Sequence, residues 1–181
     1  MNRVSAKRKA TTKLGFNSTF KAKPVVISAS EFIQAVKKPK KRKEEITYPQ
    51  AEKMLDAAFS QWVRLKSSDE NGFVRCFICG IRMRWNRSVL MHFQSRTCLA
   101  TQWDEIGCQA GCQMCNGKDL GDRSAFARRI DEDYGSGTAD ALTIKSKKST
   151  KYTTIDLLTR ARWYRERIKH IRQNSPGKFR D

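Results

Sequence analysis

The chain has 181 residues, of which 37 are lysine or arginine and 18 are acidic, so its formal net charge is +19. This length allows one domain with extensions or two very small domains, and a hydrophobic content of 39% is low for a chain packed throughout. The charge favours a polyanionic partner. No apolar run approaches the roughly 20 residues of a membrane span, and no apolar signal segment follows Met1, so we expect a soluble, cytoplasmic protein without membrane partners.

The positive charge is concentrated at the two ends of the chain. Residues 1–45 hold 13 Lys and Arg against 3 acidic residues, residues 141–181 hold 12 against 3, and residues 46–140 hold 12 of each. We therefore expect three parts: a basic arm (1–45), a central domain (46–150) and a basic C-terminal helix with its tail (151–181). The arm is too charged to bury a core, so we expect it to be disordered. Its cationic run could bind DNA phosphates or only solubilise the chain; the run contains Lys40, Lys41, Arg42 and Lys43.

Order is expected from Thr47 onward. Pro49 suits the first turn of a helix, and apolar residues from Met54 to Val63 recur at helical spacing, so we predict a helix over 49–66 whose aromatic residues enter the core. Composition and turn signals predict the elements that follow. These are strands over 73–77, 81–85 and 89–93, and helices over 122–134, 138–144 and 153–171.

Four cysteines form two Cys-x-x-Cys pairs, Cys76 with Cys79 and Cys112 with Cys115. Two residues between cysteines let one tight turn present both sulfurs to the same ion, and tetrahedral Zn²⁺ takes four such ligands. A disulfide framework is the alternative, but it suits secreted chains. We therefore predict a structural zinc in an α+β fold in which strands and a helix form a ββα unit.

Two cysteines remain outside these pairs. Cys108 lies four residues before Cys112 and could replace a ligand, whereas Cys98 has no partner by spacing. By default we interpret both as buried or half-exposed free thiols.

Several spaced motifs resemble the phage NinG (Rap) recombination family. They are Met91-His92-Phe93-Gln94-Ser95-Arg96, Thr101-Gln102-Trp103-Asp104-Glu105, Cys112-x-x-Cys115-Asn116, Gly121-Asp122 and Tyr134-Gly135. The resemblance covers about residues 50–145. It implies a treble-clef zinc site of the HNH, or ββα-metal, endonucleases, with bacterial host cytoplasm as the location.

The resemblance implies roles for three residues. His92 corresponds to the general base and also stands among the residues at the catalytic divalent cation. An imidazole with a pKa near 6.5 suits the role of base, although a structural or zinc-site histidine is the alternative. Asn116 stands where relatives carry a ligand of the catalytic cation, and its oxygen suits Mg²⁺ or Mn²⁺. Asp122 could ligate the same cation or only cap the next helix.

Three departures weaken the enzymatic interpretation. Met91 stands where the family usually has glycine, Gly107 stands where the HNH pattern has its central asparagine, and no acidic residue precedes His92. Loss of an asparagine that orients the histidine would impair a base more than abolish it.

Cations outside the arm are candidate DNA contacts. Arg87 and Arg96 flank the His92 motif, and Lys118 lies near the expected cation, but each could equally be a solvated surface residue. The last helix could lie on DNA through Arg162 and Arg165 or pack on the first helix, or do both on opposite faces.

The sequence thus predicts a phage recombination protein that binds branched DNA, such as Holliday junctions and D-loops, and cuts it with His92 and a divalent cation. A non-catalytic zinc-containing recombination factor is the alternative, followed by an RNA-binding or transcription-regulating zinc protein. A homodimer could bridge two arms of a junction, but no heptad pattern supports a coiled coil.

Overall fold

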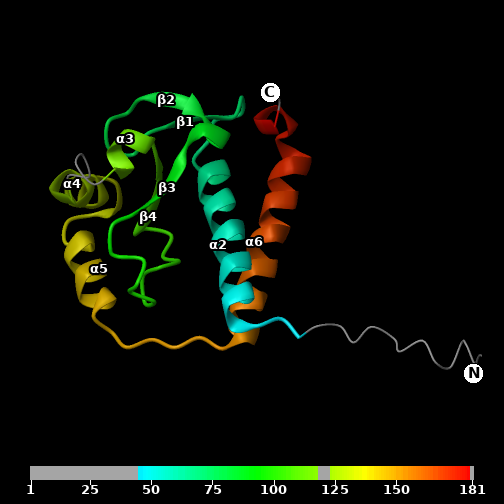
Figure 1. The fold of residues 1–181 in the computed structure, drawn as a ribbon. Helices are drawn as coiled ribbons and strands as arrows, with labels where there is room; N and C mark the ends of the chain where they lie inside the picture. The colour runs from blue at the N-terminus through cyan, green and yellow to red at the C-terminus, as the bar shows by residue number, and fades with distance from the viewer. Residues whose placement is uncertain (1–44, 118–122, 180–181) are drawn as a thin grey trace, which may run out of the picture. The chain divides into compact units, whose positions relative to one another are not determined.

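In the described part of the chain, one helix precedes four strands, which form two small antiparallel sheets, and four helices follow them, so the fold is of the α+β class, as predicted (Figure 1). The computed structural model describes residues 45–117 and 123–179. Nothing in these two stretches forms a helix both long enough and apolar enough to cross a membrane. Apart from Glu45, the predicted N-terminal arm with its cationic run Lys40–Lys43 lies outside the described residues.

The bounds of the helices and strands follow the predicted ones closely, with two additions: the short helix Gln113–Asn116 and the strand Cys108–Gly111. The helices are α2 (Tyr48–Lys66), α3 (Gln113–Asn116), α4 (Arg123–Tyr134), α5 (Thr138–Ser146) and α6 (Thr154–Asn174). The strands are β1 (Phe73–Arg75), β2 (Arg82–Arg84), β3 (Val89–His92) and β4 (Cys108–Gly111), and short 3-10 turns lie at Trp85–Arg87 and Pro176–Phe179.

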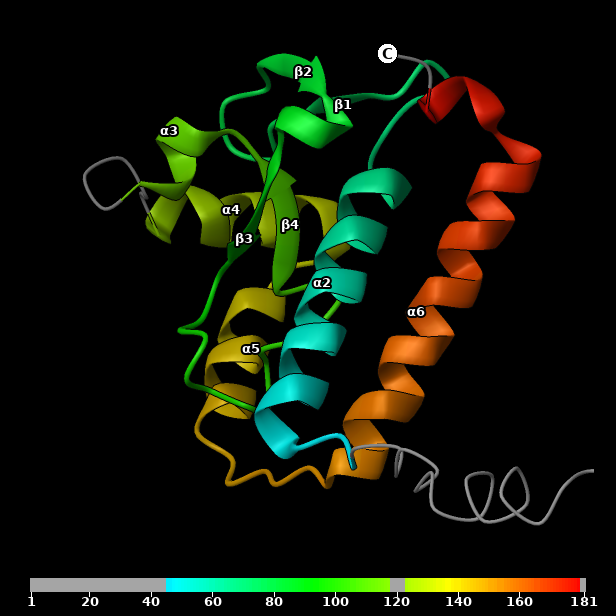
Figure 2. The same cartoon turned by 45° about the vertical axis from the view of Figure 1, so that its right-hand side comes forward.

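Helices α2 and α6 pack side by side through an aromatic core (Figures 1 and 2). The ring of Tyr164 on α6 lies 5.1 Å from that of Phe59 and 5.0 Å from that of Trp62, both on α2. Phe59 and Trp62 are buried, which confirms the prediction that the aromatic residues of the first helix form core. Aromatic pairs add about 0.5–1.5 kcal/mol each beyond the area that they bury, so this contact holds α6 against α2.

The strand that carries His92 pairs with a strand that the sequence did not predict. β3 and β4 are antiparallel, with Leu90 opposite Ala110 and His92 opposite Cys108. The segment Cys-Gln-Ala-Gly has no β-branched or aromatic residue, so its composition gives no strand signal. All four of its residues are buried, and this tertiary setting places it in the sheet.

The β3–β4 hairpin lies between two sets of helices because its side chains alternate between two cores. Leu90 joins the core of α2 and α6. Met91 points the other way and joins a second core, in which Phe126 and Ile130 of α4 and Leu142 of α5 are also buried. Both faces of the hairpin are thus covered, and the end of β3 is held in a fixed position.

Candidate functional site

Two tight turns present the four paired cysteines. Cys76 and Cys79 lie between β1 and β2, where the Gly80 N–H donates to the Cys76 carbonyl (2.9 Å) and Gly80 adopts a φ of +72°. Cys112 is the N-cap of α3, and its Sγ accepts from the Cys115 N–H (3.3 Å). The chain therefore positions all four sulfurs by local backbone geometry.

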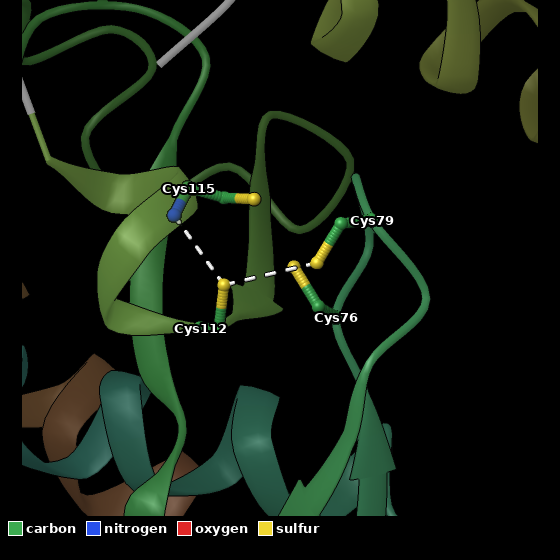
Figure 3. Close-up of side chains that lie close together, drawn as sticks. All are labelled: Cys76, Cys79, Cys112 and Cys115. Atoms are coloured by element: carbon green, nitrogen blue, oxygen red, sulfur yellow. Dashed lines mark hydrogen bonds between the residues drawn. The ribbon is translucent and has the colours of Figure 1, made fainter. Parts of the chain in front are cut away.

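These four sulfurs gather at one point (Figure 3). All lie within 4.8 Å of one another, and those of Cys79 and Cys112 are 3.8 Å apart. Tetrahedral coordination with Zn–S bonds of about 2.3 Å separates sulfurs by about 3.8 Å, so the spacing fits that ion. All four thiols are free of disulfides. The cluster could hold a metal ion such as zinc, in agreement with the predicted ligand set.

The electrostatics of the cluster also suit a cation. Burial raises the pKa of Cys76, but backbone hydrogen bonds from Cys79, Cys112 and Ile78 outweigh it and lower the pKa to about 7. Burial and the three neighbouring thiols raise the pKa of Cys115. Thiols this close cannot all ionise without a positive charge among them, and a bound cation supplies that charge.

The other two cysteines lie outside the cluster. Cys108 on β4 is fully buried, and its Sγ donates to the carbonyl of Gln102 (3.4 Å). Burial raises its pKa to about 12, so it is an inert buried thiol and does not replace a ligand in this structure. Cys98 is half-buried in the connection between β3 and β4.

A pocket of about 200 Å³ adjoins the cluster and brings His92 and Asn116 together. His92 is the last residue of β3, and Asn116 is the last residue of α3. Cys115 lines the same pocket, so the four-cysteine cluster and the pocket share a wall. Two residues that the sequence selected for one cation thus face one cavity. Its other lining residues are Ile78, Met91, Phe93, Arg123 and Phe126.

His92 is held in the neutral form. Burial and the positive charge of Arg96 lower its pKa to about 4, outweighing the opposite effects of Asp56 and the Gln102 backbone. The Arg96 Nε donates to His92 Nδ1 at 3.4 Å, which is a long hydrogen bond. The imidazole is therefore unprotonated at pH 7 and retains a lone pair, although Arg96 engages Nδ1.

The structure explains how two of the departures from the resembled family are accommodated. Met91 is buried, and its side chain fills the space left by Gly111, where an added Cβ would lie 2.3 Å from the Met91 sulfur. Gly107 accepts from the Phe93 N–H and donates to Asp104 (both 2.8 Å), so its backbone fixes the residue after His92. In place of an asparagine side chain, Arg96 contacts the imidazole.

Arg123 is a pocket residue that the sequence analysis did not select. Its Nη2 donates to Gln94 Oε1 (2.5 Å), and the Gln94 Nε2 in turn donates to Thr143 Oγ1 (2.9 Å). The guanidinium also lies 5.3 Å from the centre of the Phe93 ring. These contacts hold the Arg123 guanidinium at the edge of the pocket. In the sequence, the only indication of a role for Arg123 is its position next to Asp122.

Three further predicted DNA contacts, Arg87, Arg162 and Arg165, do not line this pocket. Arg87 is exposed in the 3-10 turn before β3, and Arg162 and Arg165 are exposed on α6. One face of α6 packs on α2, so these arginines lie on its solvent side. Lys118 and Asp122 lie outside the described residues.

Comparison of the chain with protein-family models, with curated proteins and with solved structures gives no match. The resemblance to the NinG family therefore stays a prediction from the sequence motifs.

Proposed function

We propose that the protein is a metal-dependent endonuclease that binds and cuts branched DNA, including Holliday junctions and D-loops. One observation carries the proposal: His92 and Asn116 face a single pocket that shares Cys115 with a four-cysteine cluster. A structural zinc in that cluster would fix α3 and therefore Asn116, while the buried hairpin fixes His92. The treble-clef arrangement of the resembled endonucleases is part of this proposal.

The chemistry follows from the residues that face the pocket. Bound Mg²⁺ or Mn²⁺ would neutralise charge on the scissile phosphate, with the oxygen of Asn116 as one ligand and Asp122 as a second. His92, neutral at pH 7, takes the proton from an attacking water. This requires a free ring nitrogen, so the exposed Arg96 must turn away from Nδ1, and a DNA phosphate is the partner that would draw it. Arg123 is placed to meet a second phosphate oxygen.

Charge supports DNA as the partner. The net charge of +19 is supplied by the two ends of the chain, and α6 presents Arg162 and Arg165 to solvent. Cations of this kind bind phosphates without regard to sequence. The preference for branched DNA comes from the resemblance alone.

A non-catalytic recombination factor is the second candidate, and two observations favour it. Gly107 offers no side chain to orient His92, and Arg96 occupies one nitrogen of the imidazole. An RNA-binding or transcription-regulating zinc protein is a third candidate, which the same positive charge allows.

A binding and cutting assay separates the three candidates. The zinc-loaded full chain is incubated with a labelled four-way junction, a linear DNA duplex of the same sequence and the matching RNA duplex. Each is tested with Mg²⁺, with Mn²⁺, and with EDTA at a level that leaves the zinc content unchanged. We expect cation-dependent cutting that is faster on the junction than on the duplex. Tight junction binding without cutting would instead support the non-catalytic factor, and tighter binding of RNA would support the third candidate.

A further inference from the structure

A second hollow lies away from the His92 pocket and shares no lining residue with it. It has a volume of about 890 Å³, within the range of about 300–1,000 Å³ that is typical of small-ligand sites. Its walls come from the β3–β4 connection, from α5, from the linker 147–153 and from the first turns of α6. Neither the metal centre nor the proposed catalytic pocket uses these residues.

Aromatic and cationic side chains form one wall of this hollow. Tyr152 is half-buried, and its ring meets that of Trp103 edge to face at 5.5 Å. The guanidinium of Arg160 lies 4.7 Å from the centre of the Tyr152 ring. Trp103 is itself anchored by its indole N–H, which donates to Asp56 Oδ1 (2.7 Å). Stacked rings and guanidinium planes held in this way are the surfaces on which proteins stack unpaired bases.

The charges around the hollow leave cations available for a phosphate. Two acidic residues line it, but Lys145 donates to Asp104 (2.6 Å) and Lys66 pairs with Glu105 (3.4 Å). Lys148 forms no ion pair with any residue in 45–117 or 123–179. The lysines that the linker exposes are Lys147, Lys148 and Lys151.

An apolar edge completes the hollow. Ile144 on α5 borders it and is 63% exposed, although its size would favour burial in a soluble fold. A nucleotide base needs an apolar contact and its phosphate needs a cation, and side chains of both kinds line this hollow. This combination of aromatic rings and cations does not fit a peptide that is acidic throughout, because such a peptide would leave the rings without a partner.

We propose that this hollow binds an unpaired nucleotide of single-stranded DNA, with its base on Tyr152 and Arg160 and its phosphate on Lys148. The proposal deepens the proposed function, on which the identity of the strand as DNA rests. The β3–β4 connection links the two sites. The Gln102 backbone forms a hydrogen bond with His92, and the next two residues, Trp103 and Asp104, line the hollow. Among branched DNA substrates, one with a single-stranded segment, as in a D-loop, would then use both sites.

The test measures binding of a fluorescent 12-nucleotide dT strand to the full chain without Mg²⁺, so that no cutting contributes. Tyr152→Leu keeps an apolar side chain but removes the ring, and we expect the Kd to rise about 5- to 150-fold, as loss of one stacked base predicts. Lys148→Gln removes one phosphate contact, and we expect the slope of log Kd against log salt to fall by about 0.7. A duplex of the same length should bind all variants equally.

Matched controls keep the proposal open to refutation. Tyr134→Leu removes an exposed tyrosine of α4, and Lys53→Gln removes an exposed lysine of α2; both should bind the dT strand as the wild type does. Tyr152 also touches the main core, so thermal melting is followed in each variant, and Lys148→Gln carries the test if Tyr152→Leu melts early. Unchanged affinity and salt slope in both hollow variants, equal losses in the controls, or tighter binding of the matching RNA strand would overturn the proposal.

Cutting and strand binding are separate readouts. A wild type that cuts junctions while Tyr152→Leu and Lys148→Gln bind the dT strand normally would refute the nucleotide site and leave the endonuclease intact. A wild type that never cuts, with hollow variants that lose the dT strand, would refute the endonuclease and leave the nucleotide site intact.

Discussion

Replacing His92 with glutamine is expected to lower the single-turnover rate of junction cutting about 10²- to 10⁴-fold, as removal of a general base does. Glutamine is polar and similar in length, so the end of β3 and the pocket should keep their shape. Its amide cannot take a proton from water, whereas the neutral imidazole can. The measurement is the cutting rate of a labelled junction at saturating protein, with junction affinity determined in parallel and expected to be unchanged.

The chain's second histidine supplies the control. His170 is exposed on α6, lies 2.9 Å from the Asn174 amide nitrogen, and belongs neither to the His92 pocket nor to the cysteine cluster. His170→Gln should cut at the wild-type rate. An equal loss in both variants would point to a general effect of removing imidazoles, and full activity in His92→Gln would remove this residue from the mechanism.

Replacing Cys112 with serine is expected to release the metal and to lower the free energy of unfolding by several kcal/mol. A structural zinc contributes roughly 10–16 kcal/mol in small zinc-finger peptides, so even partial loss is large beside a typical domain stability. Cys112 is the most sensitive position, because its sulfur lies 3.8 Å from that of Cys79 and also accepts the Cys115 N–H. Zinc content by elemental analysis and the denaturant midpoint report the two effects.

Cys98→Ser is the matched variant for this experiment, because Cys98 is half-buried but lies outside the cluster. It should retain one zinc per chain and a midpoint close to that of the wild type. A Cys112→Ser protein with full zinc content and unchanged stability would mean that the four sulfurs do not hold a structural ion.

The helices and the four-cysteine cluster can be predicted from the sequence because their signals are local. Thr47 and Gln50 form a capping box at the start of α2, and its apolar spacing marks the buried face. Likewise, each Cys-x-x-Cys pair is positioned by one backbone turn, so the spacing alone predicts which sulfurs share an ion.

What the sequence does not show depends on contacts between distant segments. β4 is a strand because both of its faces are covered, and its own residues carry no such preference. The position of Arg123 in the pocket depends on Gln94, 29 residues earlier. The hollow of Tyr152 and Arg160 likewise forms only when the β3–β4 connection meets α5 and α6. A single sequence does not show which distant residues these side chains contact, so it could not predict these features.

Met91 shows how a sequence departure gains a physical meaning from the structure. As a lone substitution for glycine beside the candidate base, it weakens the comparison with HNH enzymes. Its side chain lies against Gly111 of the neighbouring strand, and Met91 lines the His92 pocket without closing it. The departure is therefore compatible with an intact pocket.

The central claim is that the pocket between β3 and α3 holds a divalent cation that serves DNA hydrolysis. The most direct measurement is the single-turnover rate of junction cutting as a function of Mg²⁺ concentration, compared between the zinc-loaded wild type and Asn116→Ala. Because Asn116 is exposed and lines the pocket with His92, its loss should raise the Mg²⁺ concentration for half-maximal cutting without changing zinc content. Identical Mg²⁺ dependence in the two proteins, or no Mg²⁺-dependent cutting by the wild type, would contradict the claim.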